Sequence, residues 1–178
     1  IFVSKYLEKK TTNLFFFQKK IIIPNFLSNI FDRKNLNNER KPIFVWSVQR
    51  QKGLNETTKM WIKYIYPVNK EAKFYIFGID KLKNNFKKKY LQSKNIYHFG
   101  KVSKKKLINI YKKSTGMICL GYDETFCLNA LEANACGLPV LTFGKTALKE
   151  LITNNYNGFK VNTFESLAKK IRYLLDIN

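Results

Sequence analysis

The sequence predicts an α/β fold with a Rossmann-like parallel sheet and helices on both of its faces. Two observations support this prediction. From about residue 42 onward, short apolar runs alternate with segments in which apolar residues recur at helical spacing. Several of these segments end at glycine or proline, which commonly close helices and strands. Regular alternation of this kind is typical of parallel sheets whose crossover connections are helices.

The expected strands are short apolar runs that fit a buried parallel sheet. In chain order they cover residues 42–47, 73–78, 95–99, 116–120, 139–143 and 157–161. Residues 15–17 and 21–23 are also apolar and are expected to form core strands. None of these runs approaches the roughly 20 residues that a membrane-spanning helix needs. The 178-residue chain is 45% hydrophobic and 15% aromatic, so it is expected to fold around a proper core.

The expected helices lie between these strands. They cover residues 53–66, 81–91, 103–113 and 167–175. Ser103 stands at the right place to cap the third of them, since a serine hydroxyl can accept a hydrogen bond from the first helical turn. A further helix begins near Glu124 and is expected to end at Gly137, with Pro139 beyond it.

The start of this last helix is the most informative stretch of the chain. Glu124 stands just before the first turn, and Glu132 lies on the body of the helix, about 12 Å further along at ~1.5 Å per residue. The free N–H groups of the first turn lie between the two carboxylates and attract anions. This arrangement suits a sugar nucleotide, with the sugar at one carboxylate, the diphosphate at the helix end and the ribose at the other carboxylate.

The pair of glutamates resembles the E-x7-E motif of retaining glycosyltransferases of the GT-B fold, in particular family 4, where the motif helix belongs to the C-terminal, donor-binding domain. The resemblance implies that Glu124 contacts hydroxyls of the donor sugar and that Glu132 holds the ribose. It assigns the diphosphate to the backbone of the residues that follow Glu124, namely Thr125, Phe126, Cys127 and Leu128. The family usually has Gly-Phe-Gly at 125–127, and lost glycines would narrow the approach to the phosphate.

Other segments carry the same resemblance in the same order. Residues 21–25 look like the "v-I-P-N" segment before the domain crossover, and residues 46–54 look like the first donor-domain loop. Residues 100–111 resemble the "G-x-v-s … L-x-x-x-Y" helix. Gly144, Glu150 and residues 157–159 resemble the "G-G-x-x-E … N-G-x-l-v" tail, with Lys145 in place of the second glycine, and Gly144 is counted with the donor-binding residues. Residues 1–40 are therefore expected to be a crossover segment from a missing N-terminal domain, and residues 41–178 the donor-binding domain.

The resemblance implies transfer of a sugar from a UDP- or GDP-sugar with retention of configuration, in polysaccharide or glycoconjugate biosynthesis. Arg50 and Lys52 follow the first strand and are expected to neutralise the leaving diphosphate, which makes them catalytic candidates beside Glu124.

No metal or other cofactor is expected, because His98 is the single histidine and no cysteine pair has C-x-x-C spacing. His98 is expected to be a structural residue at a strand end. Without its N-terminal domain, the chain alone is expected to be inactive.

The net charge of +21 leaves other function classes open. The lysines are spread along the chain without the aromatic stacking pattern of RNA-binding modules, so specific nucleic-acid binding is not expected. A solvated basic surface with weak attraction to anionic membranes is expected, on a cytoplasmic protein that can be peripheral at the inner face. One alternative is a catalytically inactive nucleotide-sugar-binding module, which Cys127 and Lys145 keep open. The other, less favoured, is a basic nucleic-acid-binding protein.

Overall fold

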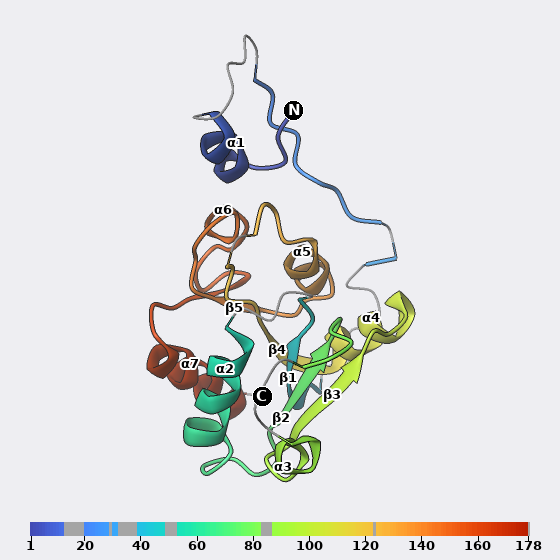
Figure 1. The fold of residues 1–178 in the computed structure, drawn as a ribbon, viewed down its shortest axis with the longest axis vertical. Helices are drawn as coiled ribbons and strands as arrows, with labels where there is room; N and C mark the ends of the chain where they lie inside the picture. Colours follow the sequence, from blue (N-terminus) through green and yellow to red (C-terminus); the bar gives the residue numbers. More distant parts are fainter. Residues whose placement is uncertain are drawn as a thin grey trace.

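The described part of the chain folds around a six-stranded sheet. The computed structural model describes residues 1–12, 20–28, 30–31, 39–48, 53–82, 87–122 and 124–177. Within these ranges the strand order is β3-β2-β1-β4-β5-β6, and all neighbouring strands are parallel (Figure 1). The predicted Rossmann-like α/β fold is confirmed.

All six predicted strands are present, each within two residues of its expected bounds. They are β1 (Lys41–Trp46), β2 (Lys73–Phe77), β3 (Ile96–Gly100), β4 (Ser114–Ile118), β5 (Val140–Thr142) and β6 (Gly158–Lys160). From β1 the chain adds strands toward one edge, and from β4 it adds them toward the other. Open sheets of this kind leave a crevice at the carboxyl ends of the two strands where the order reverses, and their ligands bind there.

Helices cover both faces of the sheet. The predicted helix at 53–66 is α2 (Leu54–Met60), continued by the π-helix η1 (Trp61–Ile65), and it packs against α7 (Phe164–Asp176) on one face. The helices α4 (Lys104–Lys113) and α5 (Leu128–Ala135) lie on the other face, as right-handed crossovers require (Figure 1). Ser103 caps α4 as predicted, with its hydroxyl accepting from the Lys106 N–H. In the described part of the chain, no helix is both long and apolar enough to cross a bilayer.

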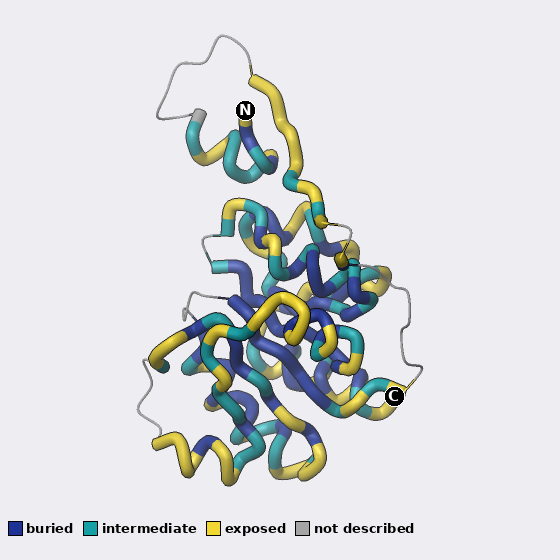
Figure 2. The backbone as a smooth tube through the Cα atoms, turned by 90° about the vertical axis from the view of Figure 1, so that its right-hand side faces the viewer, coloured by how far each residue is buried: buried dark blue, intermediate teal, exposed yellow. Residues whose placement is uncertain are grey.

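The hydrophobic core runs along the sheet between the two helical layers (Figure 2). Trp61 is fully buried at the start of η1. Its ring stacks on Phe74 of β2 at a centroid distance of 5.3 Å and contacts Phe44 of β1 at 6.0 Å. These contacts fasten the α2–η1 segment to the two strands beneath it. All three cysteines are free and buried, as predicted.

The N-terminal region differs from the prediction. Ile21, Ile22 and Ile23 are 48%, 38% and 52% exposed, and only an isolated bridge joins Ile22 to Phe2, so the predicted core strand at 21–23 is wrong. The run has strand-like side chains, but no second sheet lies in the described chain to bury them. The predicted strand at 15–17 lies outside the described residues.

Three helices differ from the sequence-based expectation. Two short helices, α1 (Lys5–Thr12) and α6 (Leu148–Leu151), were not predicted, because neither has a clear apolar stripe. The predicted helix at 81–91 is represented by α3 (Lys88–Gln92). Residues 81 and 82 are not helical, and residues 83–86 lie outside the described chain.

Arg40 ties the start of β4 to the end of α5. Its guanidinium donates to the carbonyl oxygens of Ser114 at 2.6 Å and of Gly137 at 2.8 Å. Burial lowers the pKa of Arg40, but a guanidinium remains charged in proteins. We expect Arg40→Ala to lower the free energy of unfolding by about 2 kcal/mol, because a charge-assisted contact is lost and a buried carbonyl is left without its donor.

Urea denaturation followed by circular dichroism measures this effect. Arg40→Lys is the comparison, since one ammonium group cannot reproduce the two-pronged contact of a guanidinium. We expect lysine to recover only part of the loss. Equal stability of the lysine variant and the unchanged protein would show that charge alone, and not the fork, holds these two carbonyls.

Candidate functional site

The candidate site lies at the carboxyl ends of β1 and β4, where the strand order reverses. The predicted motif helix is α5, and it begins at Leu128, four positions after Glu124. Its end agrees with the prediction, since Gly137 has a left-handed backbone (φ 72°) just beyond Ala135. The Ala130 N–H donates to the Cys127 carbonyl oxygen at 3.1 Å, whereas the Leu128 and Asn129 N–H groups come before the first helical hydrogen bond, so this end of α5 is suited to an anion.

Cys127 forms the N-cap of α5 in a conformation that favours glycine. Its backbone is left-handed, with φ 66° and ψ 68°, which costs a non-glycine residue roughly 1–2 kcal/mol. Its thiol is buried and lies 3.4 Å from the Cys119 thiol. The side chain is therefore directed toward the core beneath the loop, and the backbone keeps the shape that a glycine would give it.

The Cys119 thiol is a poor nucleophile in this position. The contact with the Cys127 thiol, together with burial, raises the pKa of Cys119 well above its usual value. A protonated, buried thiol behaves as a small apolar side chain. The pair thus serves packing beneath the start of α5.

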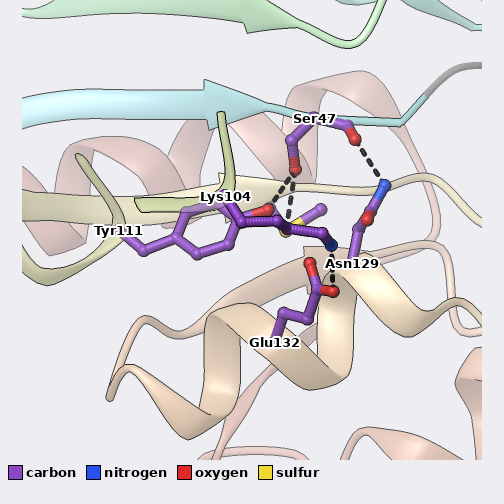
Figure 3. Close-up of polar contacts among 6 residues, drawn as sticks. Ser47, Lys104, Tyr111, Asn129 and Glu132 are labelled. Carbon is purple, nitrogen blue, oxygen red and sulfur yellow. Dashed lines mark hydrogen bonds and ion pairs between the residues drawn. The ribbon is translucent and has the colours of Figure 1, made fainter. Parts of the chain in front are cut away.

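Glu132 is the most unusual side chain of the site. It is only 5% exposed, although it carries a carboxylate. Its Oε1 atom forms an ion pair with the Lys104 ammonium group, which comes from the first turn of α4 (Figure 3). Its Oε2 atom is buried and has no hydrogen-bond partner in the described part of the chain. An unpaired buried acceptor is costly, so this oxygen is suited to a hydrogen-bond donor that is not among the described residues.

A polar network holds α5 against the end of β1. Asn129, one residue into α5, donates from its side-chain amide to the carbonyl oxygen of Ser47, and the Ser47 hydroxyl contacts the Tyr111 hydroxyl of α4 at 2.6 Å (Figure 3). Burial raises the pKa of Tyr111, so its phenol remains protonated and available for this contact. The network orients the first turn of α5 and the Glu132 side chain one turn further along.

Glu124 lies on the loop before α5 and faces a narrow cleft. The cleft is also lined by Trp46, Gly121 and Tyr122, and it holds about 10 Å³ of free space, which is room for one water. The Glu124 carbonyl oxygen accepts from the Ala147 N–H at 3.3 Å. The loop is therefore anchored from the α6 side, and Glu124 lines the cleft at the carboxyl ends of β1 and β4.

The remaining predicted backbone positions border the same loop. Thr125 is exposed, and its carbonyl oxygen accepts from the Ser4 hydroxyl at 2.6 Å. Phe126 is half-buried, and Leu128 is 43% exposed at the first residue of α5.

Gly144 has a clear structural role. Its backbone is left-handed (φ 61°), and an added Cβ would lie 3.2 Å from the Lys160 side chain. It turns the chain just after β5, at the same edge of the sheet as the crevice. The following tail is also structural: Asn157 donates to the Asn134 side chain of α5, and Gly158 leaves no room for a Cβ, which would lie 2.1 Å from the Val140 carbonyl oxygen.

Arg50 and Lys52, the two predicted cationic catalytic residues, lie outside the described residues, as does Asp123. Gly53, directly after them, has φ 85° and is the N-cap of α2. His98 is structural, as expected, since its ring nitrogen Nε2 lies 2.6 Å from the Ile79 carbonyl oxygen. Across the described ranges, no group of three or more His, Cys, Asp or Glu side chains is placed to hold a metal ion.

Four residues around Glu132 could not be predicted from the sequence. Lys104 belongs to a lysine-rich run in which no member differs visibly from the others, and Ser47 and Asn129 are ordinary residues of a strand end and a helix. Tyr111 belongs to the "L-x-x-x-Y" pattern, which does not place it near Glu132. Only the packing of α4 and α5 on β1 brings them together.

Comparison with known proteins assigns the family. Residues 28–178 match the family described as "Glycosyl transferases group 1". The N,N'-diacetylbacillosaminyl-diphospho-undecaprenol alpha-1,3-N-acetylgalactosaminyltransferase of Campylobacter jejuni subsp. jejuni is 25% identical over 148 residues. That match covers 80% of this chain but 38% of the enzyme, so the chain spans well under half of this relative's length.

Solved structures share the fold. A glycosyltransferase from Rickettsia africae superposes with a TM-score of 0.77 at 22% identity, over 98% of this chain and 52% of that one. TarM gives 0.77 at 19% identity, over 99% and 36%. The pneumococcal O-GlcNAc transferase GtfA, solved with UDP and GlcNAc, gives 0.71 at 19% identity, over 97% and 36%. With the family match over most of its length, the chain belongs to the glycosyl transferases group 1 family and has the architecture of a GT-B domain.

Proposed function

We propose that this chain is the donor-binding half of a retaining, family 4 glycosyltransferase that uses a UDP- or GDP-sugar. Glu132 binds the ribose hydroxyls, and Glu124 binds hydroxyls of the donor sugar. The first-turn N–H groups of α5 hold the diphosphate. Arg50 and Lys52 neutralise the charge that develops on the leaving diphosphate, together with the helix end. An N-terminal domain supplies the acceptor site, so the chain alone binds the donor without transferring it.

The observation that carries this proposal is the unpartnered Oε2 atom of Glu132. It is buried, it lies one turn into α5, and the other oxygen of the same carboxylate is held by Lys104. A carboxylate fixed in this way is ready to accept a hydrogen bond from a hydroxyl group. A ribose beside a diphosphate at the helix end supplies such a hydroxyl. The solved relative GtfA contains UDP and GlcNAc, which supports a nucleotide sugar as the class of ligand.

Cys127 also favours binding at this helix end. Its left-handed backbone keeps the turn that glycine gives in the family. Its thiol contacts the Cys119 thiol and does not occupy the anion site. The departure from Gly-Phe-Gly is therefore compatible with a diphosphate at α5. The net charge of +21 further supports a peripheral position at an anionic membrane surface on the cytoplasmic side.

Calorimetric titration of the chain with UDP, UDP-sugars and GDP-sugars tests the proposal. We expect one nucleotide to bind per chain, with equal affinity in the presence and absence of a chelator, because the charge on the diphosphate is met by N–H groups and cationic side chains. Near-physiological salt keeps nonspecific attraction to the basic surface low.

Two results would count against the proposal. Loss of most of the affinity on chelation would show that a metal ion holds the diphosphate. Failure of every nucleotide to bind, while a nucleic acid binds tightly and selectively under the same salt conditions, would favour the nucleic-acid alternative.

A further inference from the structure

A basic cavity lies between α1 and the loop that leads from β5 into α6. Its volume is about 400 Å³. Four lysines line it: Lys5 and Lys9 on α1, Lys145 on the loop and Lys149 on α6. Lysine and arginine make up 33 of the 178 residues of the chain, so four lysines among eight lining residues exceed what the basic composition alone would place there.

The positive charge of this cavity is not balanced. Its single acidic lining residue is Glu150. The two carboxylate oxygens of Glu150 accept hydrogen bonds from the backbone N–H groups of Lys5 at 3.1 Å and of Tyr6 at 2.7 Å. Glu150 therefore caps α1. In the described chain no ion pair involves the four lysines, whereas Lys101 and Lys104 elsewhere each have a carboxylate partner. Four lysines around one hollow that holds a single carboxylate attract an anion.

The cavity adjoins the loop that carries Glu124. Thr146, which lines the cavity, donates from its hydroxyl to the Gly121 carbonyl oxygen at 2.8 Å. Ser4, at the start of α1, donates to the Thr125 carbonyl oxygen at 2.6 Å. One side of the loop thus faces the crevice between β1 and β4, and its other side is attached to the walls of the basic cavity.

We propose that this cavity binds a phosphate group of the acceptor, the rest of which the N-terminal domain holds, so that the second substrate is a phosphate-bearing molecule. The inference rests on the proposed function, in which the donor diphosphate already has its place at the N-terminus of α5. A second anion site, on the opposite flank of the Glu124 loop, then serves a second substrate. Ammonium groups bind phosphates as point charges, without the geometry that a guanidinium requires. The phosphate belongs either to a lipid diphosphate or to a water-soluble phosphate ester.

The test uses the chain with its donor site filled by saturating UDP, at near-physiological salt. Inorganic pyrophosphate is then titrated and its binding measured by calorimetry. The test variant is Lys145→Ala/Lys149→Ala, which removes two lining charges. The control is Lys105→Ala/Lys106→Ala, which removes the same charge from exposed positions on α4. We expect the test variant to bind pyrophosphate at least about tenfold more weakly, and the control to bind it unchanged.

A second arm distinguishes the two sources of phosphate. A short isoprenyl diphosphate in detergent is compared with inorganic pyrophosphate on the unchanged chain. Tighter binding of the isoprenyl compound assigns the cavity to a lipid acceptor, and equal binding assigns it to a soluble phosphate ester. Either result supports the cavity as a phosphate site, provided that Lys145→Ala/Lys149→Ala weakens it.

Two outcomes would overturn the inference while the proposed function stands. In the first, UDP binds but pyrophosphate does not bind to the UDP-loaded chain. In the second, both double variants lose the same affinity, which would assign the attraction to the overall charge. If UDP itself fails to bind, the proposed function is wrong, and pyrophosphate alone with the same pair of variants then decides whether the cavity is an anion site.

Discussion

Replacing Glu132 with alanine is expected to abolish tight nucleotide binding while the fold survives. The variant loses the carboxylate that accepts the ribose hydroxyls in the proposed complex. A hydrogen bond to a charged group contributes about 1.5–3 kcal/mol, so the dissociation constant for the nucleotide should rise roughly 10- to 150-fold. Calorimetric titration of UDP or a UDP-sugar into both proteins measures the change.

The stability of the same variant separates a binding role from a structural one. Glu132 keeps one buried oxygen without a hydrogen-bond partner, and its ion-pair partner Lys104 is 56% exposed at the side chain. Removing such a carboxylate relieves a desolvation cost and breaks a partly screened contact. We therefore expect a thermal midpoint equal to or above that of the unchanged protein.

Two further variants complete this test. Glu71→Ala makes the same change of charge at an exposed loop position and should leave nucleotide binding unaltered. Glu132→Gln keeps the shape and one acceptor, so its loss of affinity should be smaller than that of alanine. Unchanged affinity of a folded Glu132→Ala protein would refute the ribose assignment, and a parallel collapse of stability and binding would make Glu132 a structural residue.

Trp61→Ala is expected to have the largest effect on stability. The indole ring at the start of η1 is fully buried, and it stacks on Phe74 of β2. Truncating a buried aromatic side chain of this size to alanine costs about 3–5 kcal/mol, because contacts are lost and a cavity remains. Urea denaturation should be followed by far-ultraviolet circular dichroism, since the mutation also removes a fluorophore.

The matched variant is Trp61→Phe. The indole Nε1 atom is buried without a hydrogen-bond partner in the described part of the chain. Phenylalanine keeps an aromatic ring against Phe74 and removes this unpaired donor, so we expect a loss below about 1.5 kcal/mol. A loss as large as that of alanine would mean that the indole N–H has a partner, such as a bound water, whose removal matters more than the ring.

The strands were predictable from the sequence because each is a short apolar run bounded by polar residues or glycine. Both faces of a parallel sheet are buried, so each of its strands needs a nearly continuous apolar run, whatever its position in the sheet. The same signal failed at residues 21–23, which are apolar but exposed, since a strand-like sequence reaches the core only if a sheet is there to receive it. The start of α5 was set by the left-handed Cys127, a conformation that sequence patterns do not predict for cysteine.

The candidate site was predictable only in part. Glu124, Glu132 and the first turn of α5 follow from spacing along one segment. Lys104 and Ser47 reach the same place from other elements, and their positions depend on how α4 and β1 pack against α5. Spacing along the chain holds no information about such packing. The roles of Arg50 and Lys52 stay predictions, since both lie outside the described residues.

The contact between Asn129 and Ser47 also sets when the candidate site can form during synthesis. The two residues are separated by 82 positions in the chain. At about 5–20 residues per second, a ribosome needs roughly 4–16 s to make the intervening segment. The end of β1 therefore emerges long before the helix that orients on it, and contacts between distant positions form slowly. Under the proposed function, nucleotide binding by a nascent or refolding chain would thus report completion of the central β1–β4 pairing, and a growing chain arrested before α5 would lack the candidate site.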